Sequence, residues 1–382
     1  MKFILALSFF LISLVSHTTY VYIPALILLL AYVLQSKSLL PITKLNVFSF
    51  LAFSLLVFGS ALHFKTIASN VSLPSEQSFL NNLIFAFILF FIVMFLGKIF
   101  RKQQNIENIK YAIKTVLIVH IAIFFIQFLV VYTSGHYIDL VSPVTGEESR
   151  YHNYILSGSM SDLLLYRVTG LYVEPSTYAS AMTCMIMAAV AMGINRKLVY
   201  LATSTLLLNF STIGIILFIL VMFSIFIKKI NIKFLIASLI FAIFIFAINY
   251  DFIVKFIDDF MFKVSVTSGS RFALMEYIYL DDGFLRLFGS GFFNLPRDLL
   301  EKISMGDYSV AAINDAGLFS FLVLRFGILI TIPVIFVIFK MKNIVLKSLV
   351  ICVLVSKMSF LFPIIYLPII AAWKNDKKLS NN

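Results

Sequence analysis

The chain has 382 residues, of which 61% are hydrophobic and only 13% are charged, with 42 Phe among them. A mean hydropathy of +1.01 excludes an ordinary soluble domain. The net charge of +12 does not indicate nucleic-acid binding, because the basic residues are scattered through short loops without a recognisable nucleic-acid module. We therefore predict an all-α, polytopic integral membrane protein, with residues 1–382 forming one membrane domain.

Apolar stretches of about 15 to 25 residues recur along the whole chain. The opening MKFILALSFFLISLVS resembles a signal peptide, but no clear small-x-small cleavage site follows it, so we interpret it as the first spanning helix. Further spans are expected at 20–35, 45–62, 79–97, 111–132, 175–193, 198–208, 212–227, 232–249, 316–339, 344–356 and 359–373. Because three of them fall short of the roughly 20 residues that cross a bilayer, we expect about 10 to 12 transmembrane helices.

Lysine and arginine fall mainly on one side of this topology. With the N-terminus inside, the inner loops hold 19 of the 30 basic residues but only Glu107 and Asp376 among the 18 acids. The inner face therefore carries +17 (19 minus 2) and the rest of the chain −5 (11 minus 16). Cytoplasmic loops are enriched in Lys and Arg, so this asymmetry predicts the orientation. Two larger extracytoplasmic loops, about 133–174 and 250–315, then lie outside, where any chemistry is expected.

Signatures of nucleotide and metal chemistry are missing from the sequence. No GxxxxGK[ST] stretch occurs, and the GSG at 289–291 follows no βα unit, which excludes nucleotide hydrolysis. The first outer loop contains His136, Asp139 and His152, but their spacing matches no zinc signature. Both cysteines fall inside predicted helices, where they are usually packing residues. We therefore expect no metal, no cofactor and no disulfide.

The stretch RVTGLYVEPSTYAS at 167–180 places two charges at the entrance to an apolar segment. Pro175 suits the first position of a helix, so we predict a helix from Pro175 to a stop at Gly193, capped by Glu174. There the carboxylate meets the positive helix end and can accept backbone N–H bonds. The many small residues of this helix predict a central position in the bundle. A structural cap for Glu174 and a headgroup contact for Arg167 remain open at this point.

Three motifs carry a resemblance to a known family. RVTGLYVEPS resembles the R-x-x-G-x-x-x-E-P-[SN] segment of the Wzy-type O-antigen and capsular polysaccharide polymerases, which are related to the O-antigen ligases. GSRFALMEYIYLDDGFLRLFGSGFFN resembles their second outer loop, with an arginine after a small residue and a later G-x-G-[FY] stretch. AAINDAGLFSFLVLRFG is similar to their last loop-to-helix entry, where the ligases show a His–Asn or His–Ser pair. Here Ile313 precedes Asn314, which favours a polymerase over a ligase.

This resemblance implies a metal-independent glycosyltransferase on the outer face of the bacterial cytoplasmic (inner) membrane. It would join undecaprenyl-diphosphate-linked oligosaccharide repeat units in the biosynthesis of capsule or of lipopolysaccharide O-antigen. Its partners would be those lipid-linked glycans and the lipid bilayer, with a chain-length regulator and a flippase as candidate protein partners and no nucleic acid. The alternatives are a lipid-linked oligosaccharide flippase or transporter, an O-antigen ligase, and a non-catalytic membrane scaffold. A flippase should carry its charges along a path near the bilayer midplane, whereas here most of the non-inner charges fall in the outer loops.

The residues that the resemblance implies suit a lipid diphosphate leaving group, whose charge grows as the glycosidic bond breaks. Arginines offer planar, permanently charged forks for such oxygens, and Arg167 and Arg271 are the first candidates. Glu174 is the best-placed base for the attacking sugar hydroxyl. The remaining candidate substrate-binding residues are Arg286, Glu276, Asn314, Asp315 and Arg325.

Three of these substrate-binding candidates, Glu276, Asp315 and Arg325, also have an alternative role. Glu174 is the first candidate for the base by its place in the sequence, and Glu276 and Asp315 are the alternatives that the sequence leaves open. Arg325 should lie below the outer surface, because the apolar stretch after it covers only about 21 Å. A structural ion pair, for example with Asp315, is as good an explanation of Arg325 as a substrate contact.

Overall fold

The computed structural model describes residues 1–16, 19–36, 44–66, 71–72, 76–149, 167–227, 287–291, 295–296 and 317–379. Within these ranges the regular secondary structure is helical, apart from the antiparallel pairing of two-residue strands β1 (Val71–Ser72) and β2 (Leu295–Pro296). The predicted all-α class is therefore confirmed for the described residues. The expected span at 232–249 and most of the loop at 250–315 lie outside them.

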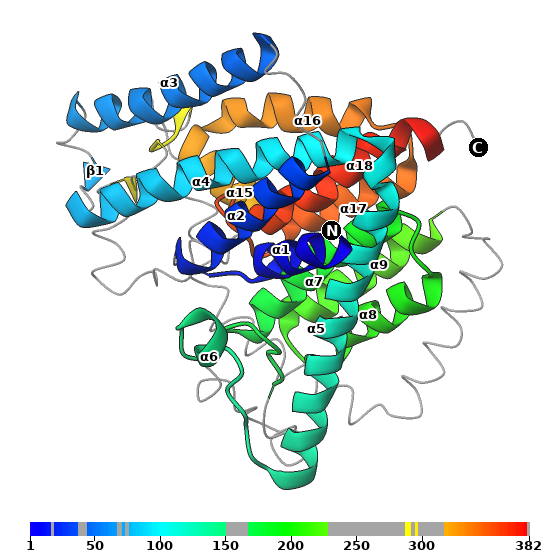
Figure 1. The fold of residues 1–382 in the computed structure, drawn as a ribbon. Helices are drawn as coiled ribbons and strands as arrows, with labels where there is room; N and C mark the ends of the chain where they lie inside the picture. Colours follow the sequence, from blue (N-terminus) through cyan, green and yellow to red (C-terminus); the bar gives the residue numbers. More distant parts are fainter. Residues whose placement is uncertain are drawn as a thin grey trace.

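The helices of the N-terminal part follow the predicted spans to within a few residues. They are α1 (Lys2–Ser13), α2 (Thr19–Gln35), α3 (Lys44–Thr66), α4 (Glu76–Arg101) and α5 (Ile106–Ser134), with the 3-10 turn η1 (Gln103–Asn105) before α5. Helix α1 packs on α2 and α5, and α2 packs on α4. Figure 1 shows α3 at the edge of the molecule, beside α4. There Phe50 and Phe53 pack against aromatic rings of α4.

Helix α7 (Pro175–Ala191) occupies the centre of the bundle, as its small residues predict. It contacts α5, α8 (Arg196–Leu208), α9 (Thr212–Phe226), α17 (Ile344–Val355) and α18 (Tyr366–Leu379), and nearly all of its side chains are buried. The stop at Gly193 is also confirmed, because this residue has φ +67° just beyond the last helical turn. There the Ile194 N–H donates to the Ala189 carbonyl at 2.9 Å, which closes the helix end.

The predicted continuous span at 316–339 is wrong, because the helix is broken at Gly327. Helix α15 (Leu318–Phe326) ends there, and the 3-10 turn η4 (Ile328–Ile330) leads into α16 (Thr331–Lys340). Gly327 has φ +71°, and a Cβ on it would lie 1.9 Å from the Leu287 carbonyl oxygen. The segment 287–291 passes so close that the Gly291 N–H donates to the Arg325 carbonyl at 2.9 Å. This neighbouring backbone thus satisfies carbonyls at the end of α15 and stops the helix.

After α17 the chain turns through the 3-10 helix η5 (Pro363–Ile365) into α18, which begins later than the predicted start at 359. In the loop between α5 and α7, the short helix α6 (Ser142–Thr145) lies away from the bundle, at the lower left of Figure 1. Asp139 organises this loop, because its carboxylate accepts the N–H groups of Val141 at 2.8 Å and Ser149 at 3.0 Å. Its side chain therefore has a structural role in the turn.

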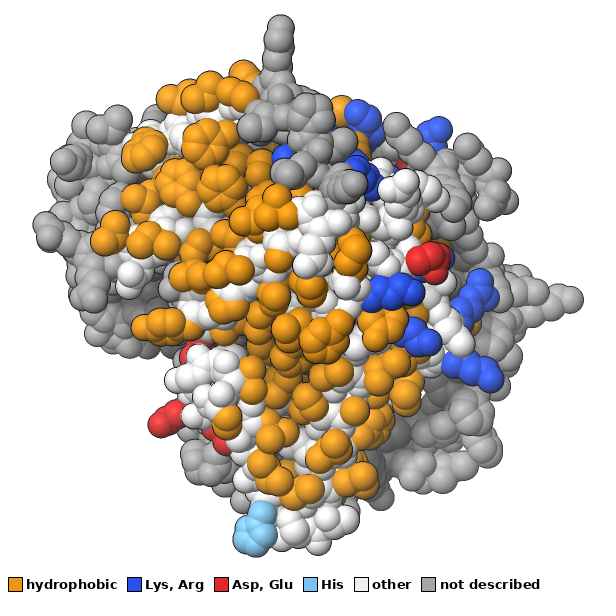
Figure 2. Space-filling view, viewed as in Figure 1, with side chains coloured by type: hydrophobic (Ala, Val, Ile, Leu, Met, Phe, Trp, Pro, Cys, Tyr) orange, Lys and Arg blue, Asp and Glu red, His pale blue; other side chains and the backbone are white. Residues whose placement is uncertain are grey.

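Hydrophobic side chains cover much of the outside of the molecule. Figure 2 shows them across the middle of one face, with Lys and Arg gathered toward the right, where an acidic side chain lies among them, and further acidic side chains at the lower left. In the part of the chain that the structure describes, two stretches are long and apolar enough to cross a membrane: Leu80–Arg101 and Gln103–Ser134. The other apolar helical stretches found there have 10 to 17 residues, and one of them is the Val47–Gly59 part of α3. Two such stretches support membrane association weakly, and a count of 10 to 12 spans stays a prediction.

Candidate functional site

The start of α7 brings the glutamate of the RVTGLYVEPS stretch, Glu174, into the bundle. Pro175 is the first helical residue and Glu174 is the N-cap, as predicted, with an extended backbone at φ −134° and ψ 148°. The expected capping by the side chain is wrong, because the Glu174 carboxylate makes no hydrogen bond to the N–H groups of α7. The carboxylate instead turns toward the chain segment that follows α17.

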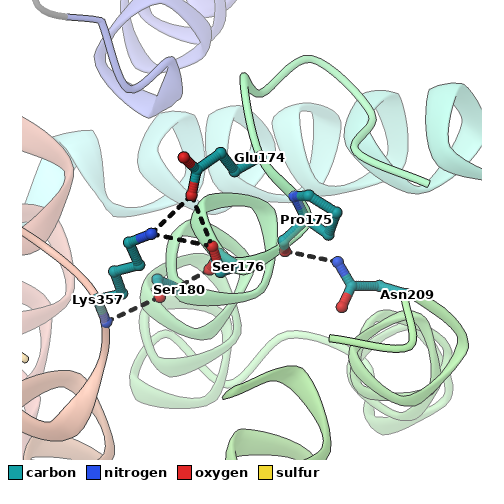
Figure 3. Close-up of polar contacts among 6 residues, drawn as sticks. All are labelled: Glu174, Pro175, Ser176, Ser180, Asn209 and Lys357. Atoms are coloured by element: carbon teal, nitrogen blue, oxygen red, sulfur yellow. Dashed lines mark hydrogen bonds and ion pairs between the residues drawn. The ribbon is translucent and has the colours of Figure 1, made fainter. Parts of the chain in front are cut away.

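The partner of Glu174 is Lys357, which lies between α17 and η5. The Lys357 Nζ donates to the Glu174 Oε2 at 2.6 Å, and the Ser176 Oγ donates to the same oxygen at 3.1 Å (Figure 3). The side chains of the ion pair are only 12% and 11% exposed. The backbone N–H of Lys357 also donates to the Ser180 Oγ at 2.9 Å. Lys357 is thus fixed to the first two turns of α7 by both its backbone and its side chain.

Sequence reasoning did not identify Lys357 as a site residue. The sequence feature that could have identified Lys357 is its position between the predicted spans 344–356 and 359–373, where a charge is costly unless it is paired. In the structure each member of the pair compensates the buried charge of the other. A carboxylate beside an ammonium and the Ser176 hydroxyl can accept a proton and can also hydrogen-bond a hydroxylated ligand.

The segment before α7 is held from the side by Gln127 of α5. The Gln127 Oε1 accepts the backbone N–H groups of Thr169 at 3.1 Å and Gly170 at 2.7 Å. The amide nitrogen of the same side chain donates to the Ile138 carbonyl at 2.9 Å, which links the segment to the residues just after α5. Gly170 has φ +60°, and its Cα passes so close to Tyr178 that an added Cβ would lie 3.1 Å from the ring. A side chain at this position would therefore disturb the chain just before Glu174.

The turn between α8 and α9 holds the other side of the α7 start. The Asn209 Nδ2 donates to the Pro175 carbonyl at 2.5 Å (Figure 3) and to the Val168 carbonyl at 3.4 Å. The Asn209 Oδ1 accepts the backbone N–H of Ser211 at 3.0 Å. Asn209 is fully buried, so these bonds satisfy a polar side chain inside the bundle.

A third anchor joins the segment to α1. The Tyr172 hydroxyl donates to the Ser13 carbonyl at 3.0 Å, and the Ser13 Oγ lies 2.7 Å from the Nε2 of His120 on α5. All three side chains are buried. Together with Gln127 and Asn209, this cluster fixes residues 168–175 to elements that are far apart in the sequence.

Comparisons of the chain with protein-family models, with curated proteins and with solved structures found no match. The interpretation of the site therefore depends on its own geometry and on the sequence motifs. The centre of this site is the buried Glu174–Lys357 pair at the start of α7.

Besides Glu174, the structure describes two of the predicted site residues, Arg167 and Arg325. Arg167 begins the anchored segment and is partly exposed. Arg325 lies in the last turn of α15, with its guanidinium carbon 5.3 Å from the centre of the Phe321 ring. This cation–π contact is one part of its surroundings. The remaining predicted residues lie outside the described ranges: Arg271, Arg286, Glu276, Asn314, Asp315 and, in the first outer loop, His152.

Proposed function

We propose that the chain is a multi-pass protein of the bacterial cytoplasmic membrane. The support is its exposed apolar surface: on α1, α3 and α16, the side chains of Phe3, Phe48, Leu55, Ile332 and Phe339 are each more than 60% exposed. Soluble proteins rarely expose apolar patches of the extent seen in Figure 2. Contact with lipid tails removes the cost of this exposure, so the bilayer is the environment that fits the surface.

The same proposal places the start of α7 on the outer side. The Tyr137 hydroxyl lies 3.1 Å from the Ser149 Oγ and also bonds the Thr169 hydroxyl, so the segment before α7 is joined to the loop that carries Asp139, Glu147 and Glu148. That loop is acidic, whereas the Lys and Arg side chains gather at the opposite edge (Figure 2). The positive-inside rule then puts the acidic loop, and the site beside it, outside.

We propose further that the protein is a polysaccharide polymerase. The observation that carries this proposal is the position of the polymerase-like motif: Arg167 and Glu174 flank a rigidly anchored segment that ends at a buried charged pair. A catalytic constellation needs such fixed supports. The lipid-linked glycan substrates can approach from the outer leaflet, which is the side that the proposal assigns to this segment.

In the proposed reaction, a hydroxyl oxygen of one glycan attacks the anomeric carbon of another. The bond between that carbon and the undecaprenyl diphosphate breaks, and the diphosphate leaves with the bonding electrons. The hydroxyl proton passes to a carboxylate, for which Glu174 is the described candidate. Arg167 and Arg271 stabilise the charge that grows on the diphosphate. The remaining substrate contacts would come from Arg286, Glu276, Asn314, Asp315 and Arg325.

One observation favours the alternative function of a lipid-linked oligosaccharide flippase. The Glu174–Lys357 pair is buried between helices, and buried charges of this kind also mark translocation paths. The two functions differ in what accumulates when the gene is deleted. Loss of a polymerase should leave single repeat units on the outer side, whereas loss of a flippase should leave lipid-linked units on the inner leaflet.

The test complements the deletion strain with variants and measures glycan length. Arg167→Ala and Arg271→Ala should each abolish long chains while the protein still inserts, and Lys should rescue poorly, because a point charge cannot make bidentate phosphate contacts. Arg196→Ala is the matched control, since Arg196 is an exposed arginine at the start of α8. Normal polymer from the two alanine variants, or lipid-linked units confined to the inner leaflet of the deletion strain, would contradict the proposal.

A further inference from the structure

Trp373, the single tryptophan of the chain, lies on α18 beside Lys340, the last residue of α16. Trp373 is 43% exposed, so its indole faces the surroundings of the protein. The Lys340 Nζ lies 5.7 Å from the centre of the Trp373 ring and 5.2 Å from that of Phe336. The lysine thus lies against two aromatic faces, which attract its charge, while it stays exposed.

Lys374, the residue after Trp373, adds a second basic group from α18, whereas Lys340 lies on α16. The Lys374 Nζ donates to the Arg101 carbonyl at the end of α4, at 2.7 Å. Burial, and then the charge of Arg101, lower the pKa of Lys374. Two cations are therefore close enough to repel each other, and a bound anion would relieve that repulsion.

The acidic residues of this side are engaged elsewhere, as far as the described ranges extend. Asp376 is buried, and its carboxylate accepts the backbone N–H groups of Lys342 at 2.9 Å and Asn343 at 2.8 Å, where α17 begins. Glu107 pairs with Lys110 at 3.2 Å on the surface of α5. Neither contact places a carboxylate on Lys340 or Lys374, so the charge of the basic cluster is left for an external anion.

We propose that Arg101, Lys340 and Lys374, together with Trp373, bind the phosphate headgroup of an anionic phospholipid in the inner leaflet. The proposal rests on the membrane placement argued above and not on the polymerase reaction. Arginine forms bidentate contacts with phosphate oxygens, and lysine adds mobile donors. Tryptophan is enriched at the level of the headgroups, where its ring is apolar and its N–H is polar. Basic pockets between helices on the cytoplasmic side are a known setting for anionic lipids.

The apolar surface beside the cluster identifies the occupant. Phe336 is 60% exposed and Phe339 is 77% exposed, and both lie on α16 within one turn of Lys340. An anion that also carries acyl chains covers these rings while its headgroup meets the cations. A nucleic acid or a free phosphate offers no apolar part for this surface. A lipid is therefore the class of ligand that fits both halves of the site.

The single tryptophan makes the site directly measurable. The full-length protein is reconstituted in phosphatidylcholine bilayers that contain a small, fixed fraction of either brominated phosphatidylglycerol or brominated phosphatidylcholine, and quenching of Trp373 fluorescence is recorded. We expect stronger quenching by the anionic lipid, with a local enrichment of roughly fivefold per contributing lysine at low salt. The preference should fall as ionic strength rises.

Substitutions assign the preference to named side chains. Lys340→Gln should reduce it, and Lys340→Gln combined with Lys374→Gln should bring the two lipids to equal quenching. Lys197→Gln is the matched control, because Lys197 is an exposed lysine at the start of α8, away from Trp373 in the sequence, and it should leave the preference intact. Thermal unfolding of each variant in detergent is the check that the fold is retained.

Three other outcomes would each contradict a different part of the proposal. Equal quenching of the wild-type protein by both lipids would refute the anionic-lipid site while leaving the membrane placement standing. An undiminished preference in the double variant would refute the assignment to Lys340 and Lys374. Absence of quenching by either lipid would refute the membrane placement itself, and the lipid site with it.

Discussion

Replacing Lys357 by methionine removes one charge from the buried pair and changes little else. Methionine keeps most of the length of the side chain, and the backbone N–H of residue 357 can still donate to the Ser180 Oγ at 2.9 Å. The Glu174 carboxylate, in contrast, loses its 2.6 Å contact with an ammonium while it stays largely buried. The substitution therefore isolates the electrostatic part of the contact between α7 and the segment after α17.

Breaking a buried ion pair by removing one partner costs about 3–5 kcal/mol, because the remaining charge is left uncompensated. Because the Ser176 hydroxyl still donates to the Glu174 carboxylate in Lys357→Met, this range is the upper bound for the loss of unfolding free energy expected of that variant. Adding Glu174→Gln removes the second charge, so the double variant should recover part of the loss. The Lys110→Met variant is the control, since the Lys110–Glu107 pair is exposed and should contribute only about 0.3–0.5 kcal/mol.

The assay is equilibrium unfolding of the purified proteins in mixed detergent micelles, followed by circular dichroism at several denaturing detergent fractions. The double-mutant cycle of Glu174 and Lys357 gives their coupling energy directly. If Lys357→Met destabilises the protein no more than Lys110→Met does, the pair is not a buried electrostatic contact. The site would then lose its central element.

Two further predictions test the backbone supports of the site. Gly327→Ala should destabilise the protein by more than the about 1–2 kcal/mol of a left-handed backbone alone, because its Cβ would also meet the Leu287 carbonyl. A Cβ at Gly97 in α4 would meet nothing within 4 Å, so Gly97→Ala should be neutral or stabilising. Thermal unfolding that ranks the two variants alike would contradict this explanation of the helix break. Gln127→Leu leaves two N–H groups of the segment before α7 without their acceptor and should cost about 1–3 kcal/mol for each. The exposed Gln103→Leu is its control, and hydrogen exchange of the Gly170 amide, which should accelerate only in the first variant, is the measurement.

Local rules predicted the elements of the fold because each depends on a short stretch of sequence. Proline at the first helical position located the start of α7 at Pro175, and glycine beyond the last turn located its end near Gly193. The small residues between them indicated a central helix, since they allow close approach of neighbours. These signals act within a few residues, so they survive in any tertiary context that keeps the helix.

The missed features depend on contacts between distant parts of the chain. Glu174 and Lys357 are 183 positions apart, and nothing in either neighbourhood specifies the other. The break at Gly327 arises because the backbone of 287–291 passes beside it, while the local sequence is as apolar as a continuous span. The capping prediction for Glu174 failed for the same reason, because a distant ammonium competes successfully with the nearby N–H groups. Pairing information of this kind is not present in one sequence.

The large separation of Glu174 and Lys357 also has a consequence for biogenesis. At a synthesis rate of about 5–20 residues per second, the 183 positions between them require roughly 10–40 s of translation. Helix α7 leaves the ribosome long before its lysine exists, so the charged helix start cannot reach its final packing during that time. Helices α17 and α18 then have to dock on an α7 that was synthesised earlier. In the membrane placement proposed above, truncation before α17 should therefore leave a protein whose early segments insert but whose α7 lacks its final packing partners.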